Sequence, residues 1–92
     1  MLRSGTRRSL SGFTFYTARR EAGAPRLGVM VTRKHAALAT ERNRLKRCIR
    51  EAFRLEQAGL GALDVLVRPP FGARASAAML LQLRALLARL GQ

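Results

Sequence analysis

The feature that most constrains this chain is a stretch of helical periodicity between Leu45 and Phe53. Apolar residues recur there three and four positions apart, which places them on one face of an α-helix: Leu45, Cys48, Ile49, Ala52 and Phe53. The other side of the same helix collects Asn43, Arg44, Lys46, Arg47, Arg50 and Arg54, with Glu51 as the single acid among them. We therefore expect a helix from about Leu38 to Gln57 that packs on a second layer and turns a cationic face outward.

Shorter segments on either side of this helix are typical of strands. Residues 12–18 are rich in aromatic and β-branched side chains, and residues 26–32 and 63–68 alternate between apolar and other positions. Residues 19–25 contain Gly and Pro and resemble a hairpin loop. We expect the strands at 12–18 and 26–32 to pair antiparallel across that loop.

A second helix is expected at the C-terminal end. Ser76 is placed to cap its N-terminus, and Gly91 to end it. One stripe of this helix is apolar: Met79, Leu80, Leu83, Leu86, Leu87 and Leu90. The element order is then β-β-α-β-α, and the natural solution is a single α+β domain over residues 1–92 with helices covering one small sheet.

Composition points to a polyanion as the partner. Eighteen Lys and Arg face five Asp and Glu, which leaves a formal net charge of +13, and sixteen of the eighteen are Arg. Arginine offers a planar fork that matches phosphate and stacks on bases. On the first helix, the spacing of Arg47, Arg50 and Arg54 creates repulsion that a bound polyanion would relieve. This favours nucleic-acid contact over a merely solvated basic face.

The sequence lacks the residues that several other classes of protein need. His35 and Cys48 are the only residues of their types, so a disulfide within the chain or a zinc site of clustered thiolates is excluded. We expect His35 to be a loop residue and Cys48 to behave as a small core hydrophobe. No apolar run approaches a membrane span and no secretory signal opens the chain, so a cytoplasmic protein is expected.

Three segments together carry a family resemblance. The helix segment 42–54, the strand 26–34 with its closing Arg33-Lys34 pair, and the strand 64–69 resemble the protein subunit of bacterial ribonuclease P. The Leu-rich last helix fits as well, and the resemblance extends from about Leu2 to Leu90. It implies a small two-layer α/β sandwich in which a mixed sheet carries the helices and a left-handed βαβ crossover passes through the basic helix.

The resemblance also implies a function. The holoenzyme removes the 5′ leader of precursor tRNA, and its RNA subunit performs the Mg²⁺-dependent hydrolysis, so no catalytic side chain is expected here. The protein binds the catalytic RNA and the leader, one protein per RNA, and broadens the range of substrates. Mg²⁺ is expected to be bound mainly by the RNA.

Residue roles carry over from the same resemblance. The residues expected to contact the catalytic RNA are Arg42, Asn43, Arg44, Lys46, Arg47, Arg50, Arg33 and Lys34. Those expected to contact the leader are Tyr16, Phe13 and Phe15. Aromatic stacking suits a substrate of variable sequence because every base has a π-face. Alternation places Phe13 and Phe15 on one face of their strand and Tyr16 on the other, so the two Phe side chains are equally suited to a core.

This chain departs from the family in two places. The family begins with a helix that forms one wall of the leader cleft, whereas Met1 to Gly5 stand where that helix should be ending. Either the start is misassigned or this version lacks the wall, so a truncated first helix is expected. Residues 35–40 also lack the Gly-Asn often found before the basic helix.

Other readings remain open from the residues alone. A small ribosomal protein or an RNA chaperone would share the size, charge and Arg content. A protein-only nuclease is disfavoured because the five acids are scattered along the sequence. A membrane-active basic peptide is disfavoured because the polar side of the last helix carries only Arg84 and Arg89.

Overall fold

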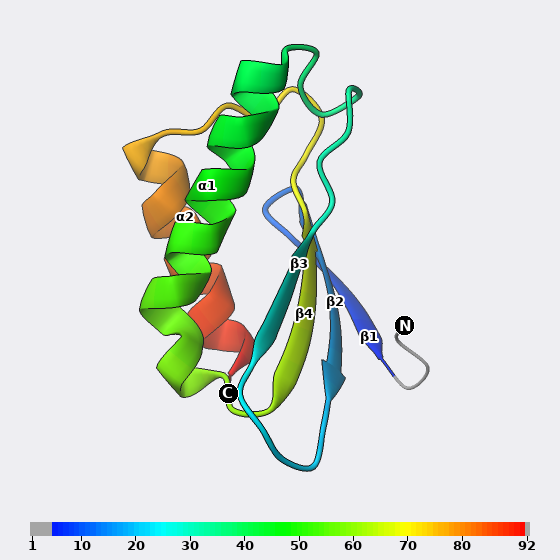
Figure 1. The fold of residues 1–92 in the computed structure, drawn as a ribbon, viewed down its shortest axis with the longest axis vertical. Helices are drawn as coiled ribbons and strands as arrows, with labels where there is room; N and C mark the ends of the chain where they lie inside the picture. The colour runs from blue at the N-terminus through cyan, green and yellow to red at the C-terminus, as the bar shows by residue number, and fades with distance from the viewer. Residues whose placement is uncertain (1–4, 92) are drawn as a thin grey trace.

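A computed structural model describes residues 5–91 as one four-stranded sheet with both helices packed on the same face (Figure 1). The strands are β1 (Thr6–Leu10), β2 (Phe13–Arg19), β3 (Arg26–Val29) and β4 (Leu63–Arg68). The helices are α1 (Ala39–Glu56), the short 3-10 helix η1 (Gln57–Gly59) and α2 (Ala77–Leu90). This is the two-layer α+β arrangement that the sequence predicts. Within residues 5–91, no helix combines the length and the apolar character needed to cross a bilayer.

The order of the strands corrects one prediction. The sheet runs β1-β2-β4-β3, with β2 antiparallel to both its neighbours and β3 parallel to β4. The expected hairpin between residues 12–18 and 26–32 is wrong, because β4 lies between those strands. β4 suits the central place since each of its residues is buried or half-buried, with Leu63, Val65 and Val67 in the core. The loop at residues 20–25 only has to cross one strand, a gap of roughly 10 Å.

A hairpin does form, but one element earlier. β1 pairs with β2 through a two-residue turn at Ser11 and Gly12, whose φ angles are 53° and 86°. Two consecutive positive φ values match the turn whose twist suits a hairpin. β1 was not predicted because its side chains are largely exposed and polar, which is typical of an edge strand.

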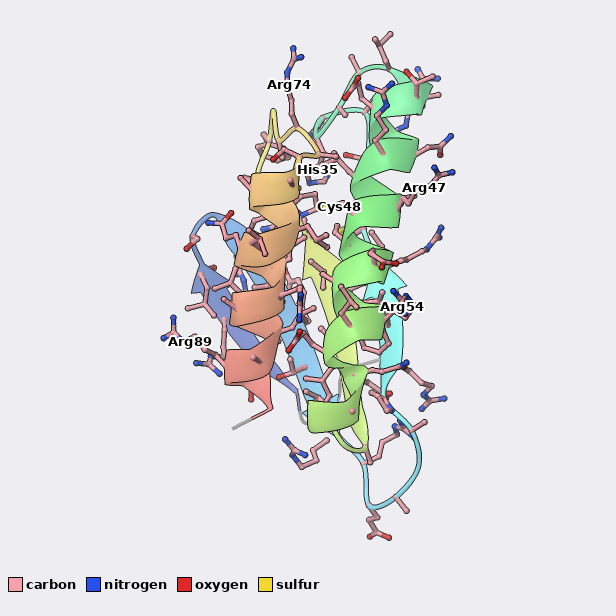
Figure 2. All side chains as sticks on the ribbon, turned by 90° about the vertical axis from the view of Figure 1, so that its left-hand side faces the viewer. His35, Arg47, Cys48, Arg54, Arg74 and Arg89 are labelled. Atoms are coloured by element: carbon pink, nitrogen blue, oxygen red, sulfur yellow. The ribbon has the colours of Figure 1, made fainter. Side chains whose placement is uncertain are left out.

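The connection from β3 through α1 to β4 is a left-handed crossover. β3 and β4 run in the same direction and lie side by side (Figure 1). With the helices in front of the sheet, β3 lies to the right of β4, so the chain moves leftward as it passes through α1 (Figure 2). Such crossovers are nearly always right-handed, so this handedness is a distinctive property of the fold and agrees with the resemblance.

The core lies between the sheet and the two helices. β2 contributes Phe13 and Phe15, β4 contributes its alternate positions, and α1 contributes Leu45, Ile49 and Ala52. The predicted stripe of α2 completes it, with Leu80 half-buried at its margin. Ser76 caps α2 as predicted, since its Oγ accepts a hydrogen bond from the Met79 N–H at 3.1 Å. This packing fixes α1 with its basic side toward solvent.

Candidate nucleic-acid interface

The outer side of α1 is a concentrated basic surface. Leu45 and Ile49 are fully buried against the sheet, so the opposite side of the helix faces outward. Asn43, Arg44, Arg47, Arg50 and Arg54 are exposed, and Lys46 is half-buried. Figure 2 shows Arg47 and Arg54 pointing away from the helix and from the rest of the protein. The structure therefore brings five of the predicted RNA-contacting residues together on one helix face.

Ion pairs divide the cations of α1 into two groups. Arg44 lies 3.4 Å from a Glu41 carboxylate oxygen, and Arg54 lies 2.5 Å from Glu51, so both are partly neutralised. The hydrogen bond from Arg54 lowers the pKa of Glu51, and the same bond raises the pKa of Arg54. Lys46, Arg47 and Arg50 have no acidic partner among residues 5–91.

These three residues, which we call the unpaired triad, line a shallow hollow. Its other walls are Asn43, Glu51 and Arg54. The amide of Asn43 can donate to a phosphate oxygen while the triad supplies charge. The arrangement fits the backbone of a polyanion better than a compact apolar ligand, because the walls are long, flexible and cationic.

The guanidinium of Arg42 is hydrogen-bonded within the protein itself. It donates to the backbone carbonyl oxygens of Ala36 at 3.1 Å and Ala37 at 2.9 Å, and the side chain is half-buried. The N-cap residue of α1 is Leu38, whose side chain cannot cap the helix, so Arg42 holds the preceding loop onto the first turn instead.

A second group of exposed cations lies where α1 begins. Arg33 and Lys34 occupy the turn between β3 and α1, and Arg74 comes from the segment that leads into α2. These three residues share a hollow with His35, Leu38, Glu41 and the backbone of residues 72–73. The only acid on its wall, Glu41, is paired with Arg44. The predicted pair therefore extends the basic surface around the start of α1.

The face of the sheet without helices carries Tyr16. In the strand register Tyr16 lies opposite Arg7 on β1 and Leu66 on β4. The Arg7 guanidinium carbon is 5.8 Å from the centre of the Tyr16 ring, within the range of a cation–π contact. The phenol is half-buried, so its ring is held by the sheet while remaining accessible. This supports the placement of Tyr16 on the opposite face from Phe13 and Phe15.

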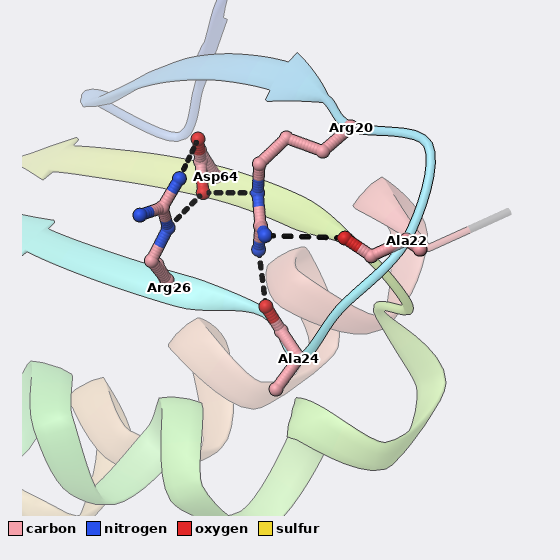
Figure 3. A network of polar contacts seen from close by, with 5 residues as sticks. All are labelled: Arg20, Ala22, Ala24, Arg26 and Asp64. Carbon is pink, nitrogen blue, oxygen red and sulfur yellow. Dashed lines mark hydrogen bonds and ion pairs between the residues drawn. The ribbon is translucent and has the colours of Figure 1, made fainter.

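At one end of the same face, the carboxylate of Asp64 is bound by two arginines, Arg20 and Arg26 (Figure 3). Asp64 accepts hydrogen bonds from Arg20 at 2.9 Å and from Arg26 at 3.0 and 3.3 Å. Arg20 also donates to the carbonyl oxygens of Ala22 and Ala24, which fastens the loop between β2 and β3. The hydrogen bond from Arg26, followed by the charges of both arginines, lowers the pKa of Asp64. Asp64 is therefore neutralised by its two arginine partners.

The structure buries Phe13 and Phe15, the two side chains expected beside Tyr16 at the leader. Their side chains are 1% and 0% exposed, and they lie on the helix side of β2 within the core. Their ring centres are 6.3 Å apart. A base cannot stack on a ring that is already covered by two helices. The alternation in the sequence correctly separated the two Phe side chains from Tyr16, and the two Phe side chains belong to the core.

Comparisons with known proteins decide the family. A family model described as Ribonuclease P matches residues 1–91. The chain belongs to the ribonuclease P family. Two solved members have the same fold: the RNase P protein from Thermotoga maritima, with a TM-score of 0.79 at 29% identity, and that from Staphylococcus aureus, with 0.73 at 30%. Both alignments cover 94% of this chain, and they cover 86% and 77% of those chains.

Curated relatives give the same family and a limit on length. Proteins called Ribonuclease P protein component from Acinetobacter baylyi and Methylococcus capsulatus are each 48% identical to this chain, over 63 and 58 residues. The matches cover 68% and 61% of this chain but only 48% and 45% of those proteins. The chain thus spans about half the length of the curated ribonuclease P relatives it matches. The expected truncated first helix concerns Met1 to Gly5, of which residues 1–4 lie outside the described part.

The remaining titratable groups do not form a protein metal site. Within residues 5–91, no three His, Cys, Asp or Glu side chains lie close enough together to hold a metal ion. Cys48 is half-buried against the core, and burial raises the pKa of its thiol. His35 is a loop residue, as predicted, but it is buried, and burial followed by the charge of Arg68 lowers its pKa.

Sequence reasoning missed two residues of the open sheet face. Arg7 was missed because β1 was not predicted. The Ser11-Gly12 turn could have revealed it, since that turn fixes a strand register in which Arg7 lies opposite Tyr16. Arg68 was assigned to a strand but not to a site. Its side chain reaches across to the Thr14 hydroxyl, 3.5 Å away, over the surface next to Tyr16.

Proposed function

We propose that this chain is the protein component of a ribonuclease P. It binds the catalytic RNA subunit and the 5′ leader of precursor tRNA, and it assists the endonucleolytic removal of that leader to give the mature 5′ end. The observation that carries the proposal is the unpaired triad on the outer face of α1 in a chain that belongs to this family.

The catalytic RNA would dock on α1. Lys46, Arg47 and Arg50 provide charge that no carboxylate of the described chain consumes, and Asn43 adds an amide beside them. Arg33 and Lys34 continue the surface at the start of the helix. Binding would release counterions in proportion to the phosphates contacted, so the affinity should fall steeply with salt. Arg44 contributes less because it shares its charge with Glu41, and Arg42 contributes mainly by fixing the loop before α1.

The leader would lie on the sheet face that carries Tyr16. A base can stack on the phenol ring if the Arg7 guanidinium moves off the ring toward a phosphate, which exchanges a cation–π contact for a charge-assisted hydrogen bond. Neither contact reads the sequence of the base, so leaders of different sequence are accepted.

Mg²⁺ bound mainly by the RNA supplies the hydrolytic chemistry when the complex is assembled. The protein side chains bind, orient and neutralise phosphates, and none of them exchanges a proton with the substrate. We further propose one protein per RNA and a cytoplasmic location, where precursor tRNA is processed.

The test compares precursor and mature tRNA as ligands of the complex between this chain and a bacterial ribonuclease P RNA. Wild-type chain should raise the affinity for precursor tRNA over that for mature tRNA. Tyr16→Ala should spare binding of the catalytic RNA and lower precursor affinity by the worth of one stacked base, about 1–3 kcal/mol. Equal losses for precursor and mature tRNA would contradict a leader contact at Tyr16. Failure of the wild-type chain to bind this RNA would favour a general RNA-binding protein.

A further inference from the structure

Phe71 is a large aromatic residue that the fold leaves in solvent. Its side chain is 68% exposed, the highest value among the large apolar residues of the described chain. It follows the Pro69-Pro70 pair that ends β4 and lies at the corner of a tight turn, in which the Ala73 N–H donates to the Pro70 carbonyl oxygen at 3.3 Å. Gly72 adopts a φ of 76°, as the third position of a type II turn requires. The turn therefore presents Phe71 outward.

Phe71 is also held in place. Its ring centre lies 5.0 Å from that of His35, with 33° between the planes. The Gly72 N–H donates to the His35 carbonyl oxygen at 3.0 Å, which ties the turn to the same residue. His35 is only 3% exposed and accepts a hydrogen bond at Nδ1 from the Thr32 N–H at 2.8 Å. An exposed ring supported from beneath by a buried one is pre-organised to receive another flat group.

The surroundings of Phe71 are basic. It lines a shallow hollow with Gly12, Thr14, Arg68, Pro69 and Pro70, and no acid of the described chain contributes to that hollow. The Arg68 guanidinium donates a hydrogen bond to the Thr14 hydroxyl at 3.5 Å, and Thr14 is only 6% exposed. An aromatic ring beside a cation in a groove without carboxylates suits a single strand of nucleic acid.

The strand register connects this hollow to Tyr16. Tyr16 lies opposite Leu66, and Thr14 lies opposite Arg68, two residues further along the same pair of strands. Alternate positions of a strand share a face, so Tyr16 and Arg68 both lie on the side without helices, and Phe71 follows where β4 ends. The order along this face is an aromatic ring, a cation and a second aromatic ring.

We propose that Phe71 is a second base-stacking platform for single-stranded RNA, with Arg68 contacting the phosphate between it and Tyr16. The inference rests on the proposed function, because it takes the strand to be the 5′ leader of precursor tRNA. It extends the leader contact from the middle of the open face to the end of β4. Stacking at both rings accepts any base, so the second platform raises leader affinity without a sequence requirement.

The chain contains no Trp, which allows a direct test. Phe71→Trp retains a stacking surface and becomes the only tryptophan of the protein. In the complex with a bacterial ribonuclease P RNA, precursor tRNA should quench its fluorescence and mature tRNA should not. Leu81→Trp is the matched control, since Leu81 is 65% exposed on α2, on the other layer of the fold. Its emission should be unchanged by either ligand.

Affinity measurements separate stacking from a structural role. Phe71→Leu keeps an apolar cover over His35 but removes the π-face, and Phe71→Trp keeps both. We expect Phe71→Leu to weaken precursor binding by about five- to tenfold, the lower part of the range for one stacked base, with mature tRNA unaffected. Phe71→Trp should bind precursor as tightly as wild type.

The outcomes distinguish the two proposals. If wild-type chain prefers precursor tRNA while Phe71→Leu binds it equally well, Phe71 is only a cover for His35 and this inference is overturned. Quenching of Phe71→Trp by mature tRNA, or equal quenching of Leu81→Trp, would overturn it as well. If wild-type chain shows no preference for precursor tRNA, the proposed function fails first, whatever the Phe71 variants do.

Discussion

Replacing Arg47 with Ala tests whether the unpaired triad binds the catalytic RNA. Arg47 is exposed and has no acidic partner in the described chain, so its charge is fully available to a phosphate. The loss of one phosphate contact should reduce the slope of log K against log salt by about one. Between 50 and 200 mM salt, that slope corresponds to roughly a threefold change in affinity per contact.

The fold should tolerate this change. The Arg47 side chain makes no hydrogen bond or ion pair in the described structure, and Ala is the strongest helix former, so the free energy of unfolding should change by less than about 0.5 kcal/mol. A weaker affinity for the RNA can then be attributed to the interface. At fixed moderate salt, the loss of a charge-assisted hydrogen bond should cost about 1.5–3 kcal/mol of binding.

The matched control is Arg89→Ala. Arg89 is also exposed, but it lies in the last turn of α2, across the molecule from Arg47 (Figure 2). The Arg89→Ala substitution removes the same net charge as Arg47→Ala, but from a different surface. Filter binding or fluorescence titration of the catalytic RNA at four or more salt concentrations should show a reduced slope for Arg47→Ala and an unchanged slope for Arg89→Ala. Equal slopes for the two variants would refute the assignment of α1 as the docking face.

Three further changes test the fold around the site. Phe15→Ala should destabilise the protein by about 3–5 kcal/mol, measured by urea unfolding, because the ring is fully buried; a stable variant with impaired leader binding would restore the leader role. Ser76→Ala should cost about 0.5–2 kcal/mol through the lost cap of α2, and no change in melting temperature would contradict the cap. His35 has a lowered pKa in the folded state, so the unfolded chain binds more protons, and stability should fall as pH drops below about 6.5. His35→Asn should lose that pH dependence in urea unfolding between about pH 7.5 and 5, and a retained dependence would assign it to another group.

The helices were predictable because their signal is local. The apolar arc of α1 and the stripe of α2 repeat at helical spacing, and each arc is long enough to demand burial. The basic face of α1 follows from the same geometry, since burying one side of a helix exposes the other. Even the pairing of Arg44 and Arg54 with acids three residues before them can be seen in the spacing.

The sheet was less predictable because strand order depends on competition between distant segments. Nothing local to residues 12–32 indicates that β4 will enter between β2 and β3. β1 has no apolar alternation, and only its two-residue turn announces it. Left-handed crossing likewise results from the packing of the whole fold and entered the sequence reasoning only through the family resemblance.

Individual roles at the site depended on which face the helices cover. Alternation separates Tyr16 from Phe13 and Phe15 but does not say which face of the strand stays open. The structure shows that the helices cover the face with the two Phe side chains. Arg42 shows a second limit: its position within a basic run suggests RNA contact, yet two nearby carbonyl groups engage its guanidinium. Charge patterns reveal a surface, whereas hydrogen-bond partners decide what each arginine on it can do.

The most direct test of whether this chain is the protein component of a ribonuclease P is cleavage of a precursor tRNA. A bacterial ribonuclease P RNA is assayed at low Mg²⁺, with and without this chain. We expect the RNA alone to be slow under these conditions and the chain to restore removal of the 5′ leader at the mature end. Arg47→Ala should need a higher protein concentration for the same rate. Tight binding of the wild-type chain to the RNA without any stimulation of cleavage would contradict the claim.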